Sequence, residues 1–167
     1  MVVTLIEIGG HTTHPVGKRL SNFANRPFMI DGVACGGIEG FLQSLKCPDI
    51  KMQREICAFI GRNAKSAGSA YNNWKSEQML HWQGSSFGRS TRSYTLLVAR
   101  AYDELYYQDP TFKADLIALG GAMIQHSIGN SDGHDTTLME SEMLWHLERL
   151  RHNALREAFQ AILNPVS

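Results

Sequence analysis

The chain has 167 residues, of which 43% are hydrophobic and 19% are charged, a composition typical of a globular protein and not of a disordered one. Sixteen basic residues balance sixteen acidic ones, so the formal net charge is zero. A general electrostatic attraction to nucleic acid is therefore not expected.

The length suits one domain spanning residues 1–167, and no apolar run is long enough to cross a bilayer, so no membrane partner is expected. Glu7 stands where the apolar core of a secretory leader would continue, which favours a cytoplasmic location. The three cysteines are odd in number and contain no Cys-x-x-Cys pair, so neither a disulfide framework nor a cysteine zinc site is indicated.

Residues 2–8 are rich in β-branched types and predict a strand that ends at a glycine pair. A loop is expected over residues 11–26. It contains His11 and His14 in a His-x-x-His spacing, which can hold a metal when it lies on a helix. The neighbouring glycine and proline favour a loop instead, and no third ligand is evident, so no metal site is predicted.

A hairpin and two helices are predicted next. Strands at 28–30 and 33–35 flank the turn dipeptide Asp31-Gly32. A helix over 38–46 follows two glycines, and Asp49 can cap a second helix that runs to about Ile60 and ends at Gly61-Arg62.

The helix over 38–46 carries two stripes. Its apolar residues repeat at i, i+3, i+4 and i+7, which predicts a buried face. Glu39, Gln43 and Lys46 form a polar stripe beside that face. This stripe is either a solvated helix flank with a weak ion pair or the wall of a pocket, and the bulky residues and glycines around it fit a pocket.

Residues 63–92 are crowded with Gly, Ser and Asn and read as a long loop. The loop carries aromatic residues, Trp74 and Trp82 among them, and Arg62, Lys65, Arg89 and Arg92 give this region local positive charge. A long aromatic loop in a compact domain is often a binding loop or a lid. The cations suit a phosphate, although solvated loop charge is the commoner explanation.

The last third of the chain reads as mostly helical. Helices are expected over 93–108 and from Asp109-Pro110 to Leu119, followed by a short strand at 123–128. His126 in that strand is interpreted as structural. A turn-rich loop over 129–135 then leads, with Asp135 as a cap, into a final helix over 136–163. The buried face of this helix is expected at Leu138, Met139, Met143, Leu147 and Leu150 and can continue through Ala154, Leu155, Ala158, Phe159 and Ile162.

One set of motifs resembles a known family. Leu20-Ser21-Asn22-Phe23, then Pro27-Phe28, Asp31-Gly32 and Glu39-x-x-x-Gln43-x-x-Lys46, is similar in order and spacing to the NADAR (YbiA-like) family. Gly61-Arg62 falls at the Gly-Arg of that family. Ile38-Glu39-Gly40 stands where the family has Ser-Glu-His. Asn130-Ser131-Asp132-Gly133 matches the Trp-Gly-Asp-Gly loop only at Asp-Gly.

The resemblance implies an α+β fold, a mostly helical single domain with a small β-sheet, which agrees with the predicted elements. It also implies an N-glycosidase that cleaves the C1–N bond of a phosphorylated riboside. The expected substrate is ADP-ribose on a guanine base, free or in nucleic acid, or a ribosylamino-pyrimidine intermediate of riboflavin synthesis. The alternatives are a binding module for ADP-ribose or another nucleotide without catalysis, and a regulatory protein whose pocket has decayed.

Roles follow for the matched residues. Glu39 is the first candidate to stabilise the oxocarbenium ion or activate water, with Asp132 as its partner. Lys46 would bind phosphate or protonate the base, and Lys46 or Lys18 could form a Schiff base with the opened sugar. The expected substrate-binding residues are Ser21, Asn22, Phe23, Gln43, Arg62, Trp74 and Trp82. No metal or cofactor is expected, and an oligomer is possible.

Overall fold

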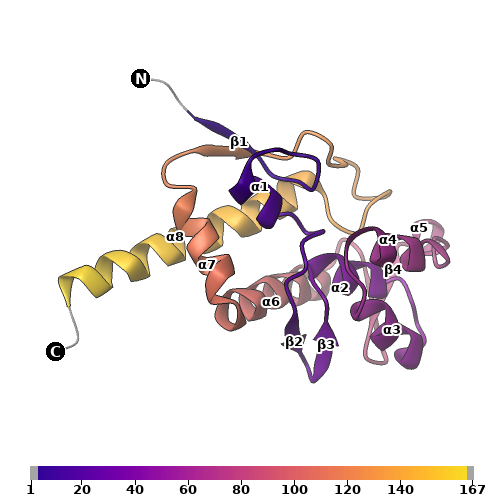
Figure 1. Cartoon of the computed structure of the whole chain (residues 1–167). Coiled ribbons are helices and arrows are strands. Elements are labelled where there is room, and N and C mark those ends of the chain that lie inside the picture. The colour runs from indigo at the N-terminus through magenta and orange to yellow at the C-terminus, as the bar shows by residue number, and fades with distance from the viewer. Residues whose placement is uncertain (1–3, 165–167) are drawn as a thin grey trace.

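Eight helices and three two-stranded sheets make up residues 4–164, the part of the chain that the computed structural model describes (Figure 1). The predicted class is confirmed: a mixed fold of helices and small sheets in a single domain. Within residues 4–164, no helix combines the length and the apolar character needed to cross a membrane.

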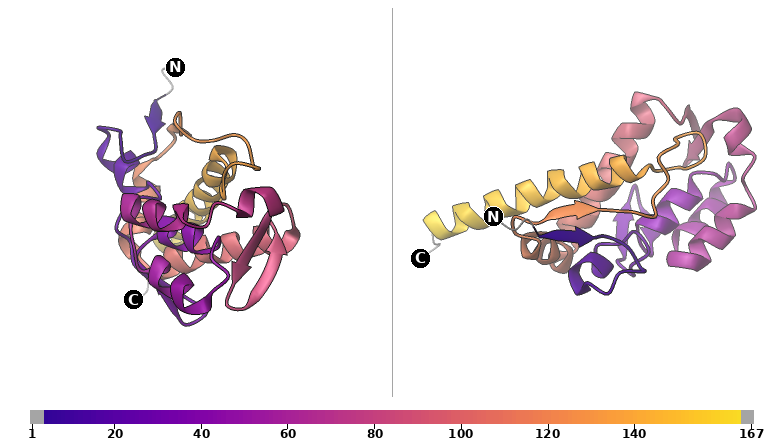
Figure 2. Two further views of the ribbon diagram at one scale, coloured as in Figure 1. Left: turned by 90° about the vertical axis from the view of Figure 1, so that its right-hand side faces the viewer. Right: turned by 90° about the horizontal axis from the view of Figure 1, so that it is seen from above.

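The first sheet joins segments from near the two ends of the chain. Strand β1 (Leu5–Glu7) pairs in parallel with β6 (Met123–Gln125), and the Ile8 amide continues the pairing by donating to the Gln125 carbonyl at 2.8 Å. The start of the strand predicted over 2–8 lies outside the described residues. This pairing brings the segments after β1 and β6 side by side above α2 and α4 (Figures 1 and 2).

The prediction of a continuous loop after β1 is wrong, because the segment contains a short helix. Helix α1 (Pro15–Arg19) begins after His14, whose Nδ1 accepts a hydrogen bond from the Gly17 amide at 3.2 Å. Pro15 suits the first helical position because it lacks an amide hydrogen that would need a partner there. His14 therefore acts as a helix cap in this structure.

The hairpin is confirmed, and both helices after it are found, although they end two and about three residues earlier than predicted. Strands β2 (Phe28–Ile30) and β3 (Val33–Cys35) pair antiparallel, and both turn residues, Asp31 and Gly32, have positive φ. Helix α2 (Ile38–Ser44) is buried along its whole length. The Asp49 carboxylate caps α3 (Ile50–Cys57) by accepting from the Met52 amide at 2.8 Å.

The prediction of a long loop over 63–92 is wrong. Gly61 begins a helix instead of ending one, and the segment contains α4 (Gly61–Ser69), α5 (Trp74–Glu77), β4 (Met79–Trp82) and β5 (Ser85–Gly88). The small residues that indicated a loop are what let α4 approach α2, because Ala64 and Gly68 are buried between the two helices.

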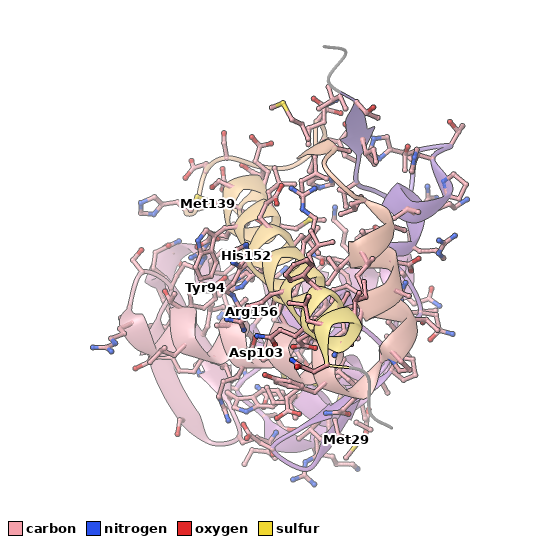
Figure 3. All side chains as sticks on the ribbon, turned by 90° about the vertical axis from the view of Figure 1, so that its left-hand side faces the viewer. Met29, Tyr94, Asp103, Met139, His152 and Arg156 are labelled. Atoms are coloured by element: carbon pink, nitrogen blue, oxygen red, sulfur yellow. The ribbon has the colours of Figure 1, made fainter. Side chains whose placement is uncertain are left out.

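The last helices agree with prediction except where the final one begins. Helices α6 (Arg92–Gln108) and α7 (Pro110–Ala118) are found, and Asp109 caps α7. Helix α8 (Glu140–Leu163) begins four residues later than predicted, and Glu142 rather than Asp135 caps it, by accepting from the Met139 amide at 2.7 Å. Figure 3 looks onto α8, with Met139 near its start and Arg156 farther along.

The buried face of α8 is shorter than predicted. Met143, Leu147, Leu150 and Ala154 pack in the core, but Phe159 is 61% exposed and Ile162 is 76% exposed. The end of α8 extends beyond the elements that cover its first half (Figure 1). Apolar spacing alone could not show where the neighbouring elements stop.

Candidate active site

A cavity of about 410 Å³ lies between α2 and α4 on one side and the segments that follow β1 and β6 on the other. Its size is in the range of small-molecule sites. Its walls are formed by Gly10, His11, Ser21, Asn22, Phe23, Glu39, Leu42, Gln43, Arg62, Lys65, His126, Ile128, Gly129, Asn130, Thr136, Thr137, Leu138, Met139, Glu140 and Met143.

The α2 wall presents a buried carboxylate. Glu39 is 8% exposed and accepts a hydrogen bond from Gln43 Nε2 at 2.9 Å. Burial raises the pKa of Glu39, although the Gln43 hydrogen bond and the charges of Lys65 and Lys46 act in the opposite direction. A carboxylate with a raised pKa takes up a proton more readily, as a general base must.

Gln43 brings an acceptor that the described residues do not satisfy. Its Oε1 is buried and has no hydrogen-bond partner within residues 4–164. Gly68 makes room for this atom, because a Cβ at that position would lie 2.1 Å from it. A donor on a bound molecule would satisfy Oε1, and leaving such an atom unpaired costs about 1–3 kcal/mol.

The Ser21-Asn22-Phe23 segment lies beside this carboxylate. The Glu39 amide donates to the Asn22 carbonyl at 3.1 Å, which joins the segment to the start of α2. The Asn22 side chain is held by the Tyr102 hydroxyl, which donates to Oδ1 at 2.7 Å. Burial raises the pKa of Tyr102, so its hydroxyl keeps its proton as the donor. With Oδ1 held in this way, the Asn22 amide is fixed at the cavity wall.

Helix α4 adds positive charge to the cavity. Arg62 and Lys65, both exposed, line it from the first two turns of α4. No salt bridge joins either side chain to an acidic group among residues 4–164. Both cations can therefore contact an anionic group of a ligand.

The opposite wall carries two histidines that the sequence did not assign to the site. His11 Nε2 lies 3.2 Å from Glu7 Oε1, and the rings of His11 and His126 are 6.5 Å apart. Ser127 donates to the same Glu7 oxygen from its amide at 2.8 Å and from its hydroxyl at 3.0 Å. Burial raises the pKa of Glu7, but these hydrogen bonds outweigh it and lower the pKa overall.

Six of the predicted site residues line the cavity: Ser21, Asn22, Phe23, Glu39, Gln43 and Arg62. The other five do not. Lys18 is exposed on α1, and Asp132 is exposed in the loop before α8. Lys46 is 9% exposed beyond the end of α2, where burial lowers its pKa to about 8 even though the charge of Glu39 raises it.

The two tryptophans belong to the core and not to a mobile binding loop. Trp74 begins α5 and is 2% exposed. Trp82 packs edge-on against Phe41 with 5.2 Å between ring centroids, and its Nε1 donates to Asp31 Oδ2 at 2.7 Å. Residues 63–92 fold into regular elements instead of a loop, and these elements bury the large apolar surfaces of both tryptophans in the core.

Sequence reasoning missed the residues that tertiary contacts bring to the cavity: His11, His126, Thr136, Thr137, Met139 and Glu140. Lys65, named from the sequence as a cation that suits a phosphate, does line the cavity, one helical turn after Arg62. Within residues 4–164, no three His, Cys, Asp or Glu side chains are placed to hold a metal ion.

Residues 14–152 match the family described as Bacteriophage protein GP30.3. The chain belongs to this family. A relative from Enterobacteria phage T4, described as "Uncharacterized 17.1 kDa protein in Gp30-rIII intergenic region", is 38% identical over 133 residues, which are 79% of this chain and 88% of that protein. The family match covers the α2 wall and His126, while Glu7 and His11 precede it.

The fold of this GP30.3 member is that of Escherichia coli YbiA. The NMR structure of YbiA superposes with a TM-score of 0.63 at 19% sequence identity, covering 95% of this chain and 89% of YbiA. At this identity the comparison shows the shared fold. The family expected from the motifs is consistent with this match.

Proposed function

We propose that the protein is an N-glycosidase that hydrolyses the C1–N bond of a phosphorylated riboside. The substrate is ADP-ribose linked to a guanine base, free or in nucleic acid, or a ribosylamino-pyrimidine. The observation that carries the proposal is the buried Glu39 carboxylate in a cavity that also offers cations and an unsatisfied acceptor.

The burial of Glu39 supports a role at the anomeric carbon. When the C1–N bond of a riboside breaks, positive charge develops on the sugar ring. A carboxylate in a site with little water stabilises that charge more strongly than one in solvent. With its pKa raised, Glu39 is also suited to take a proton from the attacking water.

The neighbouring groups support recognition of the sugar and its phosphate. Gln43 Oε1 can accept a hydrogen bond from a ribose hydroxyl, and the Asn22 amide can donate one. Arg62 can bind phosphate oxygens in a bidentate manner, with Lys65 one turn away as a second positive charge. Phe23 offers a face on which a base can stack.

The test is turnover by wild-type protein and by Glu39→Gln. ADP-ribosyl-guanosine, ADP-ribosylated DNA and the ribosylamino-pyrimidine phosphate are offered, and the released base and sugar are followed by mass spectrometry. Glu39→Gln should lower turnover about 10²–10⁴-fold, the usual size of an acid–base contribution. Glu55→Gln, which changes an exposed carboxylate on α3, should match wild type.

Binding separates this proposal from the alternative of a nucleotide-binding module without catalysis. The affinity of Glu39→Gln for ADP-ribose, measured by calorimetry, should stay close to that of wild type because Arg62, Lys65 and Asn22 remain. Equal binding by both proteins with no release of base by wild type would contradict the N-glycosidase and leave the binding module.

A further inference from the structure

His126 lies on the cavity wall opposite α2, and the proposed function has so far assigned it no part. Its Nδ1 lies 2.6 Å from the Ile8 carbonyl oxygen. A carbonyl can only accept a hydrogen bond, so Nδ1 carries a hydrogen and donates it. The parallel pairing of β1 with β6 creates this contact, because Ile8 directly follows β1 and His126 directly follows β6.

The second ring nitrogen is left for a ligand. No residue within 4–164 makes a hydrogen bond to Nε2 of His126, and the ring is half-buried against the cavity. Gly129 lies between His126 and Glu140 and lets both side chains pack against it, because it has no side chain of its own. A Cβ at Gly129 would lie 2.7 Å from His126 Cδ2 and 2.4 Å from Glu140 Cβ. The ring nitrogen beside Cδ2 is Nε2.

The cavity that His126 lines carries charged groups on several of its walls. Glu140 approaches His126 across Gly129, and His11, which is paired with Glu7, lies on its other side. Arg62 and Lys65 contribute positive charge from α4. The carboxylates of Glu140 and Glu7 therefore lie on the same side of the cavity as His126, opposite Glu39 on α2.

We propose that His126 is a catalytic residue of the N-glycosidase and donates a proton from Nε2 to the leaving base. This inference rests on the proposed function and adds the acid that the reaction needs. A base that departs without a proton leaves as an anion, which is a poor leaving group. Histidine is the side chain best suited to exchange protons near neutral pH.

The proton and electron balance is that of a hydrolysis. The C1–N bond breaks with its electron pair passing to the base nitrogen, and the base takes the proton of the His126 imidazolium. A water oxygen bonds to C1 and gives its proton to Glu39. The solvent then returns that proton to the imidazole. The neutral form left after donation has its hydrogen on Nδ1, which is the tautomer that the Ile8 carbonyl holds.

The variant His126→Asn tests this assignment. The Asn Nδ2 can replace Nδ1 as the donor to the Ile8 carbonyl, but the variant has no group in place of Nε2. Two substrates are compared: ADP-ribosyl-guanosine, whose base needs a proton, and 4-nitrophenyl ribofuranoside 5-phosphate, whose leaving group departs readily as an anion. The same change at the exposed His152 of α8 is the control.

His126→Asn should lower kcat/KM about 10²–10⁴-fold on ADP-ribosyl-guanosine and leave the nitrophenyl substrate close to wild type. It should also remove the fall of kcat/KM toward high pH that a required acid produces. An equal loss on both substrates would show a structural role and overturn the inference, and so would no loss on either. Failure of wild type on all substrates would instead overturn the proposed function.

Discussion

At the residue scale, burial alters the acid–base behaviour of three side chains, Glu39, Lys46 and His146. Burial raises the pKa of the Glu39 carboxyl and lowers the pKa of the Lys46 ammonium. In both cases the charged form loses hydration that the protein does not fully replace. Glu39 faces a cavity where this has a chemical use, whereas Lys46 lies outside the cavity and supplies charge from a distance.

His146 gives a prediction for stability. It is 3% exposed, stacks on Tyr102 with 4.5 Å between ring centroids, and has its pKa lowered to about 4 by burial and by the charge of Arg149. Unfolded histidine has a pKa of about 6.5. Between these values the unfolded chain binds more protons, so the free energy of unfolding falls as the pH is lowered through this window.

Between pH 7 and pH 5 this one group should reduce the free energy of unfolding by about 2 kcal/mol. Urea titrations at both pH values would measure the loss. His146→Phe should remove that part of the pH dependence, while His152→Phe, at an exposed position of the same helix, should keep it. An unchanged pH dependence in His146→Phe would show that other groups produce the loss.

At the scale of elements, glycines set how closely α2 approaches its neighbours. A Cβ at Gly40 would lie 2.3 Å from the Phe59 carbonyl oxygen, and one at Gly68 would lie 2.1 Å from Gln43 Oε1 and 2.8 Å from Gln43 Cβ. These close approaches bring α3 and α4 against the helix that carries Glu39. The cavity wall therefore depends on positions that make no contact with a ligand.

Gly68→Ala should displace Gln43 and break its hydrogen bond to Glu39. We expect a loss of about 1–3 kcal/mol in the free energy of unfolding, as for other overpacked cores, together with a fall in turnover. The control is Gly121→Ala, since a Cβ at Gly121 would have no heavy atom within 4 Å. Thermal melts and turnover of both variants would test this, and a Gly68→Ala protein as stable and active as the control would contradict it.

At the scale of the whole molecule, a buried charge network fastens the N-terminal segment to α7. Arg26 is 7% exposed, and its guanidinium donates to the Asp115 carboxylate and, at 2.7 Å, to Asp109 Oδ2. Arg19 adds a second contact to Asp115 at 2.6 Å. The network holds the residues that precede the hairpin, including the Ser21-Asn22-Phe23 wall of the cavity.

Arg26→Met should lower the free energy of unfolding by about 3–5 kcal/mol, because it leaves buried carboxylates without their main partner. Arg100→Met breaks an exposed pair with Asp31 and should cost about 0–1 kcal/mol. Denaturant titrations of the two variants would measure the difference. Equal losses would show that the buried network does not carry this stability.

The sequence by itself determined the elements that local signals specify. The hairpin at 28–35, the Asp49 and Asp109 caps, and α2 with its paired Glu39 and Gln43 follow from turn residues, capping residues and helical spacing. Each of these signals acts within about one turn of helix or one tight turn, so neighbouring residues suffice to produce it. The α2 wall of the cavity was predictable for the same reason.

Only the tertiary structure decided the rest, because the contacts involved join residues far apart in the chain. Helix α4 is rich in small residues and is stabilised by packing on α2 more than by its own propensity. The parallel pairing of β1 with β6 placed His11 and His126 in the cavity, and no local pattern encodes a partner so distant in sequence. Trp74 and Trp82 are likewise buried in the core and do not line the cavity, although their aromatic side chains had suggested a role in binding.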